Sequence, residues 1–115
     1  MLRIEPAPTF NGKVLITTPG GEPGVLDITW RHMGVRALAD WWDLVRDKPV
    51  VDALCEVIES VSGLHDKDGR PVPHSPEALR QLLDAYHAAG GELLAAYFEQ
   101  LTAAREKNSG ARPVP

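Results

Sequence analysis

The chain has 115 residues, of which 43% are hydrophobic and 24% are charged, as is typical of one soluble globular domain. Its formal net charge of −4, from 12 basic and 16 acidic side chains, gives no electrostatic reason to expect nucleic acid or an anionic membrane as partner. The N-terminus has no apolar stretch long enough for a signal peptide, and no segment approaches the roughly 20 apolar residues that span a bilayer. We therefore expect a protein of a reducing cytoplasm.

The first third of the chain is predicted to form β structure. Residues 13–17 and 25–30 are rich in branched side chains, and in the second run Leu26, Ile28 and Trp30 alternate with polar residues. A loop rich in proline and glycine at residues 19–24 joins the two runs, which predicts a β-hairpin with a long tip. Two strands alone are marginal in water. Residues 1–4 are the only local candidate for a third strand, and an open strand edge hints at self-association.

From residue 34 onward the spacing of apolar residues is helical. Four segments carry apolar residues at i, i+3, i+4 and i+7, and each is predicted to form an α-helix. The four stripes are Leu38, Trp41, Trp42 and Val45; Val51, Leu54, Cys55 and Ile58; Leu79, Leu82, Leu83 and Tyr86; and Leu94, Tyr97, Phe98 and Leu101.

Prolines, glycines and one serine set the expected boundaries of these helices. Pro49 suits the first turn of the second helix, and Ser75, which follows a loop from about residue 62 to 74, suits an N-cap. Gly90 and Gly91 are expected to end the third helix. The predicted fold class is α+β, an N-terminal antiparallel β-hairpin or small sheet followed by about four α-helices. Residues 1–108 form its single domain, and residues 109–115 form a flexible C-terminal tail.

No residue pattern in the chain points to catalytic or metal chemistry. The four histidines are far apart and lack the close His or Cys pairs of structural zinc sites, and the only cysteine, Cys55, is expected to be a buried, inert thiol. A calcium loop around residues 66–69 fails because its register places Leu64 and Ser75 where carboxylates are needed. Phosphate-binding loops and nucleophile elbows are missing as well. We expect no enzymatic activity, no metal and no cofactor.

Neighbouring aromatic residues on two predicted helices are the candidates for a protein-binding surface. Trp41 and Trp42 lie about 100° apart on a helix, so both cannot point to the core. We expect Trp42 in the core and Trp41 over a half-buried seam, with the alternative that one indole anchors a partner. Tyr97 and Phe98 divide in the same way. The candidate partner-binding residues are Trp41, Tyr97 and Phe98, on the outer side of their helices.

Several strings, taken in chain order, resemble the tail assembly chaperones of siphophages. A Pro-Gly turn at residues 19–21 is followed by LDITWRH at 26–32, by Trp42 and by IESVSGL at 58–64. The most specific segment is 63–83, which includes DGRPVPHSPEALRQLL at 68–83, and the last helix carries AY at 96–97 and AREKN at 104–108. The likeness covers roughly residues 9–108. Leu64 and His74 stand where the family has tryptophan and phenylalanine, so the loop between them has less aromatic packing.

The resemblance implies a binding protein of the host bacterial cytoplasm. Members of the family hold the tape measure protein, a very long helical polypeptide, soluble before the tail tube polymerises around it. They also help to recruit tail tube subunits, often through a longer frameshifted form, and they leave before the tail is finished. A groove between helices suits such a client, and many weak copies provide avidity. We also expect a homo-oligomer, a ring or short spiral with the hairpin edge as one contact.

Three other functions compete with this one. The nearest is a small structural phage tail or head–tail connector protein, which would be found in finished particles, whereas a chaperone would be absent. A regulatory or antitoxin-like module is disfavoured because the chain lacks a basic recognition helix. An enzyme is disfavoured because no catalytic constellation is present.

Overall fold

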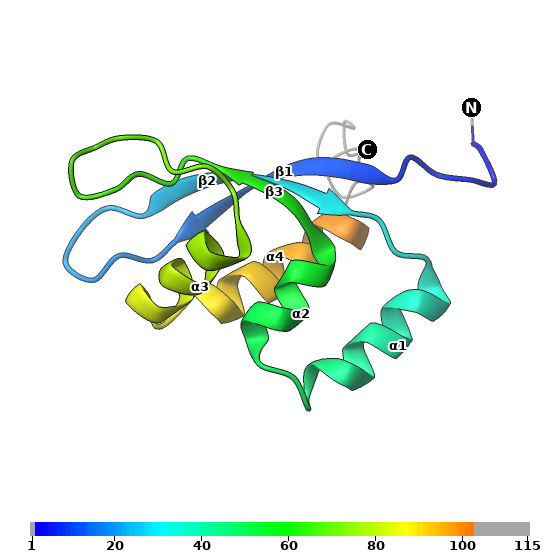
Figure 1. The fold of residues 1–115 in the computed structure, drawn as a ribbon. Helices are drawn as coiled ribbons and strands as arrows, with labels where there is room; N and C mark the ends of the chain where they lie inside the picture. The colour runs from blue at the N-terminus through cyan, green and yellow to red at the C-terminus, as the bar shows by residue number, and fades with distance from the viewer. Residues whose placement is uncertain (1, 103–115) are drawn as a thin grey trace, which may run out of the picture.

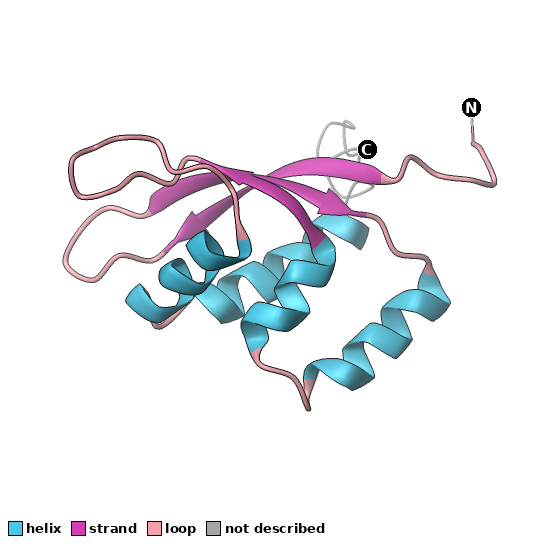
Figure 2. Cartoon of the chain, viewed as in Figure 1, coloured by secondary structure: helices cyan, strands magenta, loops and turns pink. Residues whose placement is uncertain are grey.

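The computed structural model describes residues 2–102, which form a three-stranded antiparallel sheet with helices packed under one face (Figures 1 and 2). The elements in chain order are β1 (Thr9–Ile16), β2 (Gly24–Arg31), α1 (Val35–Val45), α2 (Val50–Val57), β3 (Ile58–Ser62), α3 (Pro76–Ala85) and α4 (Ala89–Thr102). The strand order is β1-β2-β3, so β2 is central. The predicted α+β class, with a small sheet and four helices, is confirmed in this part of the chain. The tail predicted at residues 109–115 lies outside it.

The third strand does not come from the segment that the sequence suggested. Residues 2–4 belong to no strand, and β3 instead follows α2 directly. A bulge places one extra residue, Glu59, between the pairs Trp30↔Ile58 and Thr29↔Ser60. Because of this bulge, Ile58 and Val61 both face the core at a spacing of three residues. The sequence assigned Ile58 to the second helix because Ile58 lies seven residues after Val51 and four after Leu54, which is a helical spacing.

The two faces of the β1–β2 hairpin differ as the alternation predicted. Val14, Ile16, Leu26, Ile28 and Trp30 are all buried against the helices. The outer face carries polar pairs between directly opposed residues: the ammonium of Lys13 lies 2.7 Å from a carboxylate oxygen of Asp27, and the hydroxyl of Thr29 donates to Asn11 at 2.9 Å. Cross-strand pairs of this kind stabilise a sheet whose outer side faces water.

Two helix boundaries were predicted with different success. The hydroxyl of Ser75 accepts a hydrogen bond from the amide of Ala78 at 3.0 Å at the start of α3, so the predicted cap is confirmed. The prediction that Gly90 and Gly91 end the third helix is wrong, because α3 ends at Ala85 and both glycines lie in the first turn of α4. A Cβ on Gly90 would lie 3.1 Å from a methyl carbon of Val50. The glycine therefore allows α2 and α4 to approach closely.

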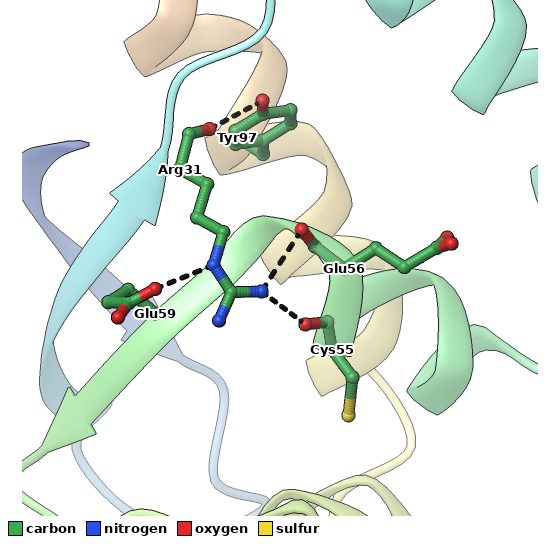
Figure 3. Close-up of polar contacts among 5 residues, drawn as sticks. All are labelled: Arg31, Cys55, Glu56, Glu59 and Tyr97. Atoms are coloured by element: carbon green, nitrogen blue, oxygen red, sulfur yellow. Dashed lines mark hydrogen bonds and ion pairs between the residues drawn. The ribbon is translucent and has the colours of Figure 1, made fainter. Parts of the chain in front are cut away.

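Arg31, the last residue of β2, ties the sheet to the C-terminal end of α2 (Figure 3). Its Nη1 donates to the main-chain carbonyl oxygens of Cys55 and Glu56 at 3.0 and 3.3 Å, and its Nε lies 2.6 Å from a carboxylate oxygen of Glu59. Carbonyl groups in the last turn of a helix lack partners within the helix and carry its negative end. The guanidinium therefore stabilises the point at which α2 becomes β3.

Helix α4 lies along the outer edge of β1 and occupies part of it. Gln100 donates from Nε2 to the carbonyl oxygen of Lys13 at 2.8 Å, and Glu92 accepts from the amide and the hydroxyl of Thr17 at 3.0 and 2.5 Å. The hydrogen bond from the amide of His32 to the carbonyl of Pro8 shows that the backbone groups of even-numbered β1 residues bond to β2. The backbone N–H and C=O groups of odd-numbered residues therefore point away from β2, toward the open edge of the sheet. The hairpin edge is thus only partly open to another chain.

Candidate protein-binding surface

Tyr97 lies at the centre of a connected aromatic cluster. Its ring centroid is 6.3 Å from that of Phe10, 5.2 Å from Trp30 and 5.5 Å from Trp41. The side chain is fully buried, and its hydroxyl donates to the main-chain carbonyl of Arg31 at 2.8 Å (Figure 3). Burial raises the pKa of the Tyr97 phenol to about 12. Tyr97 therefore belongs to the core and fixes α4 against the sheet.

The two tryptophans of α1 point in the opposite sense to the one expected. Trp41 is 3% exposed, and its indole N–H donates to the carbonyl of Ala53 on α2 at 3.1 Å. Trp42 is 41% exposed and meets the ring of Phe98 edge-on, with centroids 4.7 Å apart. The expectation of Trp42 in the core is wrong. Helical spacing shows that both indoles lie near the apolar stripe of α1. Which of the two is buried depends on the position of α2, because α2 supplies the acceptor for the buried indole N–H.

Of the three predicted partner-binding residues, only Phe98 reaches the surface. Trp41 and Tyr97 are core residues, whereas Phe98 is half-buried and packs against Trp41 and Trp42. Partner binding at this position stays a prediction. The sequence nevertheless directed attention to the two helices, α1 and α4, that meet at an exposed aromatic pair.

One exposed apolar residue of α1 was missed. Val35 is 91% exposed, and it lies seven residues before Trp42, so both occupy the same flank of α1, roughly 10 Å apart along the helix axis. A search for i, i+7 pairs beside the main stripe would have found it. We name Val35, Trp42 and Phe98 the α1–α4 surface. On α4, the half-buried Leu94 and Leu101 lie one turn to either side of Phe98.

The described residues offer little for metal or thiol chemistry. In residues 2–102, no three or more His, Cys, Asp and Glu side chains cluster so that they could hold a metal ion. The thiol of Cys55 is half-buried rather than buried, and burial raises its pKa. No helix in this range is both long and apolar enough to cross a bilayer. The α1–α4 surface is therefore the feature that we consider for function.

Comparison with known proteins decides the family. A model of the phage tail assembly chaperone family matches residues 1–67. The chain belongs to this family. The match spans β1, β2, α1, α2 and β3, so it includes Val35 and Trp42 of this chaperone but not Phe98. Most of segment 63–83, on which the resemblance was most specific, also lies outside it. No curated protein and no solved structure matches the chain.

Proposed function

We propose that this chaperone binds the tape measure protein through the α1–α4 surface and keeps it soluble until the tail tube assembles. Membership of the family supports the assembly role. The observation that carries the choice of surface is Trp42, a large side chain that is 41% exposed and packed edge-on against Phe98. Tryptophan is enriched among the residues that dominate binding energy, and a packed ring loses little conformational entropy when a partner covers it.

The geometry of the surface suits a helical client. A long helix that has not yet been enclosed exposes apolar stripes, which promote aggregation. Val35 and Trp42 lie two helical turns apart on one flank of α1. Amphipathic helices are commonly recognised through a groove in which apolar contacts recur at this kind of spacing. In this proposal Trp41 and Tyr97 act beneath the surface, where they hold α1 and α4 in place.

We extend the proposal to the rest of the assembly task. The chaperone acts without a catalytic step in the host bacterial cytoplasm, forms homo-oligomers, and helps to recruit tail tube subunits, in part through a longer frameshifted form. Only a few apolar side chains contribute to each contact, so each contact is weak. Many copies along one long client then give avidity, while the polymerising tube still displaces them one at a time.

Co-expression with the tape measure protein of the same phage tests the surface. The paired substitution Val35→Ser and Trp42→Ser is expected to move the client into the insoluble fraction and to weaken its binding by about 30-fold or more. Leu44→Ser is the matched control, because Leu44 is 49% exposed on the same helix but lies about 200° around it from Trp42. Urea denaturation checks that every variant still folds. Unchanged client solubility in a folded Val35→Ser, Trp42→Ser protein would refute the proposal.

Mass spectrometry of finished particles separates this role from the nearest alternative, a structural tail or head–tail connector protein. A chaperone that leaves during assembly is expected to be absent from purified phage while it is abundant in the infected cell. Stoichiometric amounts in the particle would favour the structural role instead.

A further inference from the structure

An arm of exposed apolar residues projects from one end of the sheet. Residues 2–8 are all exposed, and Leu2 and Ile4 are 99% and 101% exposed. The arm is held at Pro8, whose carbonyl accepts from the amide of His32 at 2.9 Å. Figure 1 shows that residues 2–7 extend away from the sheet at the end opposite the β1–β2 loop. Two aliphatic side chains are thus left fully in water.

A small depression lies at the opposite end of the sheet. It has a volume of about 170 Å³ and is lined by Gly24, Val25, Gly63, Leu64 and Tyr86, with the buried Ile16, Leu26 and Leu82 beneath and with Thr18 and His65 at its polar side. Small-molecule sites are larger, at roughly 300–1,000 Å³, whereas this volume suits one aliphatic side chain. Beside it, Val25 and Leu15 are directly paired across the strands and 48% and 59% exposed.

The arm is too short to reach the depression of its own chain. The six residues from 2 to 7 span at most roughly 21 Å, whereas the eight residues of β1 that separate the arm from the depression extend over about 26 Å. An arm that turned back along the β1 edge would also meet α4, because Glu92 and Gln100 are already hydrogen-bonded there. Among residues 2–102, the occupant that remains is therefore the arm of a second copy.

We propose that the N-terminal arm of one copy docks at the far end of the sheet of another copy, with one of Leu2 and Ile4 in the depression and the other over the Leu15–Val25 pair. The two arm residues point the same way, about 7 Å apart, if the arm docks in an extended conformation. Such a contact joins unlike surfaces, so it builds closed rings or open spirals. This inference rests on the homo-oligomer of the proposed function and names the surfaces that form it.

Charge supports the same pairing of surfaces. Arg3, between the two aliphatic residues, has no ion-pair partner among the described residues. At the receiving end, Glu22 in the hairpin loop also has none, whereas in the loop after β3 the acidic Asp66 and Asp68 are balanced by Lys67 and Arg70. Exposed pairs of opposite charge add little affinity but favour the correct orientation. Arg3→Glu is therefore expected to weaken association more than it alters folding.

Two variants remove opposite halves of the contact. The arm variant carries Leu2→Ser and Ile4→Ser. The filled variant carries Gly24→Phe, because Gly24 lines the depression and a Cβ at this position meets no atom within 4 Å. Gly24→Ala is the matched control, since its methyl group is too small to fill the space. Each variant alone is expected to weaken self-association by about 10- to 100-fold, whereas Gly24→Ala assembles as the wild type does.

Sedimentation of the full-length chain over a range of concentrations, without client, tests the inference. An equal mixture of the arm variant and the filled variant is expected to form one-to-one dimers and nothing larger, because the filled copy supplies an arm and the arm variant supplies an open depression. A wild type that stays monomeric, variants that assemble normally, or a mixture without dimers would each overturn the inference. The client proposal is tested separately: the arm variant is expected to retain one-site binding of a tape measure segment, and Val35→Ser, Trp42→Ser to retain self-association.

Discussion

Replacement of Gln100 by alanine is expected to destabilise the fold by about 2 kcal/mol. Gln100 accepts a hydrogen bond from the indole N–H of Trp30 at 2.6 Å and donates to the carbonyl of Lys13 at 2.8 Å, so it bridges α4 to two strands. Trp30 is 0% exposed, and a buried donor left without an acceptor costs about 1–3 kcal/mol. The carbonyl of Lys13 is at the sheet edge and gains water instead. The melting temperature should fall by roughly 10 °C.

Gly12 provides a second test of the same contact. A Cβ on Gly12 would lie 1.7 Å from the side-chain oxygen of Gln100, so Gly12→Ala should expel that side chain and cost about as much as Gln100→Ala. In the Gln100→Ala background the space is free, and Gly12→Ala should cost less than about 0.5 kcal/mol or even stabilise the strand. The expected coupling energy between the two positions is therefore at least about 1 kcal/mol.

Urea denaturation monitored by tryptophan fluorescence measures all four corners of this cycle. Glu99→Ala is the control, because Glu99 is exposed and adjacent to Gln100, and its side chain has no hydrogen bond or ion pair with the described residues. It should stay within about 0.5 kcal/mol of the wild type. The reasoning fails if Gln100→Ala behaves like this control, or if the effects of Gly12→Ala and Gln100→Ala simply add.

Three further predictions concern stability. Trp41→Ala should lower the free energy of unfolding, measured in urea, by about 3–5 kcal/mol. Trp42→Ala should lower it by no more than about 1 kcal/mol, because only Trp41 is buried. Equal losses would contradict the assignment of Trp41 to the core. Hydrogen bonds from Thr17 lower the pKa of Glu92 below its ordinary value of 4.5. The ionised Glu92 therefore stabilises the folded state fully above pH 4.5, and this stabilisation is lost as the pH falls through the lowered pKa. The melting temperature of the wild type should therefore drop more between about pH 5 and pH 3 than that of Glu92→Gln, and parallel curves would refute this. Gly63→Ala should lower the free energy of unfolding by about 1–3 kcal/mol, as measured by thermal unfolding. Gly63 has a φ of +104°, and a Cβ added there would lie 2.9 Å from a carbonyl oxygen of β2. A neutral effect would argue against this backbone conformation.

The candidate surface could be predicted from the sequence only in part. The spacing of apolar residues placed Trp41 and Trp42 on one helix and Tyr97 and Phe98 on another, and the structure brings these two helices together. Which member of each pair faces out depends on neighbours that are distant in the chain. Trp41 is buried because Ala53 on α2 offers its carbonyl, and Tyr97 is buried because the end of β2 offers another.

By itself, the sequence determined the elements that depend on near neighbours. The alternation of Leu26, Ile28 and Trp30 specified a strand with one buried face, and Ser75 specified the start of α3, because period and capping act over a few residues. The tertiary structure alone decided that Ile58 leaves the helix for a strand. There β2 offers a row of unpaired backbone groups, and a bulge keeps both apolar residues of β3 in the core. Local spacing cannot reveal a partner that is brought near only when the whole chain folds.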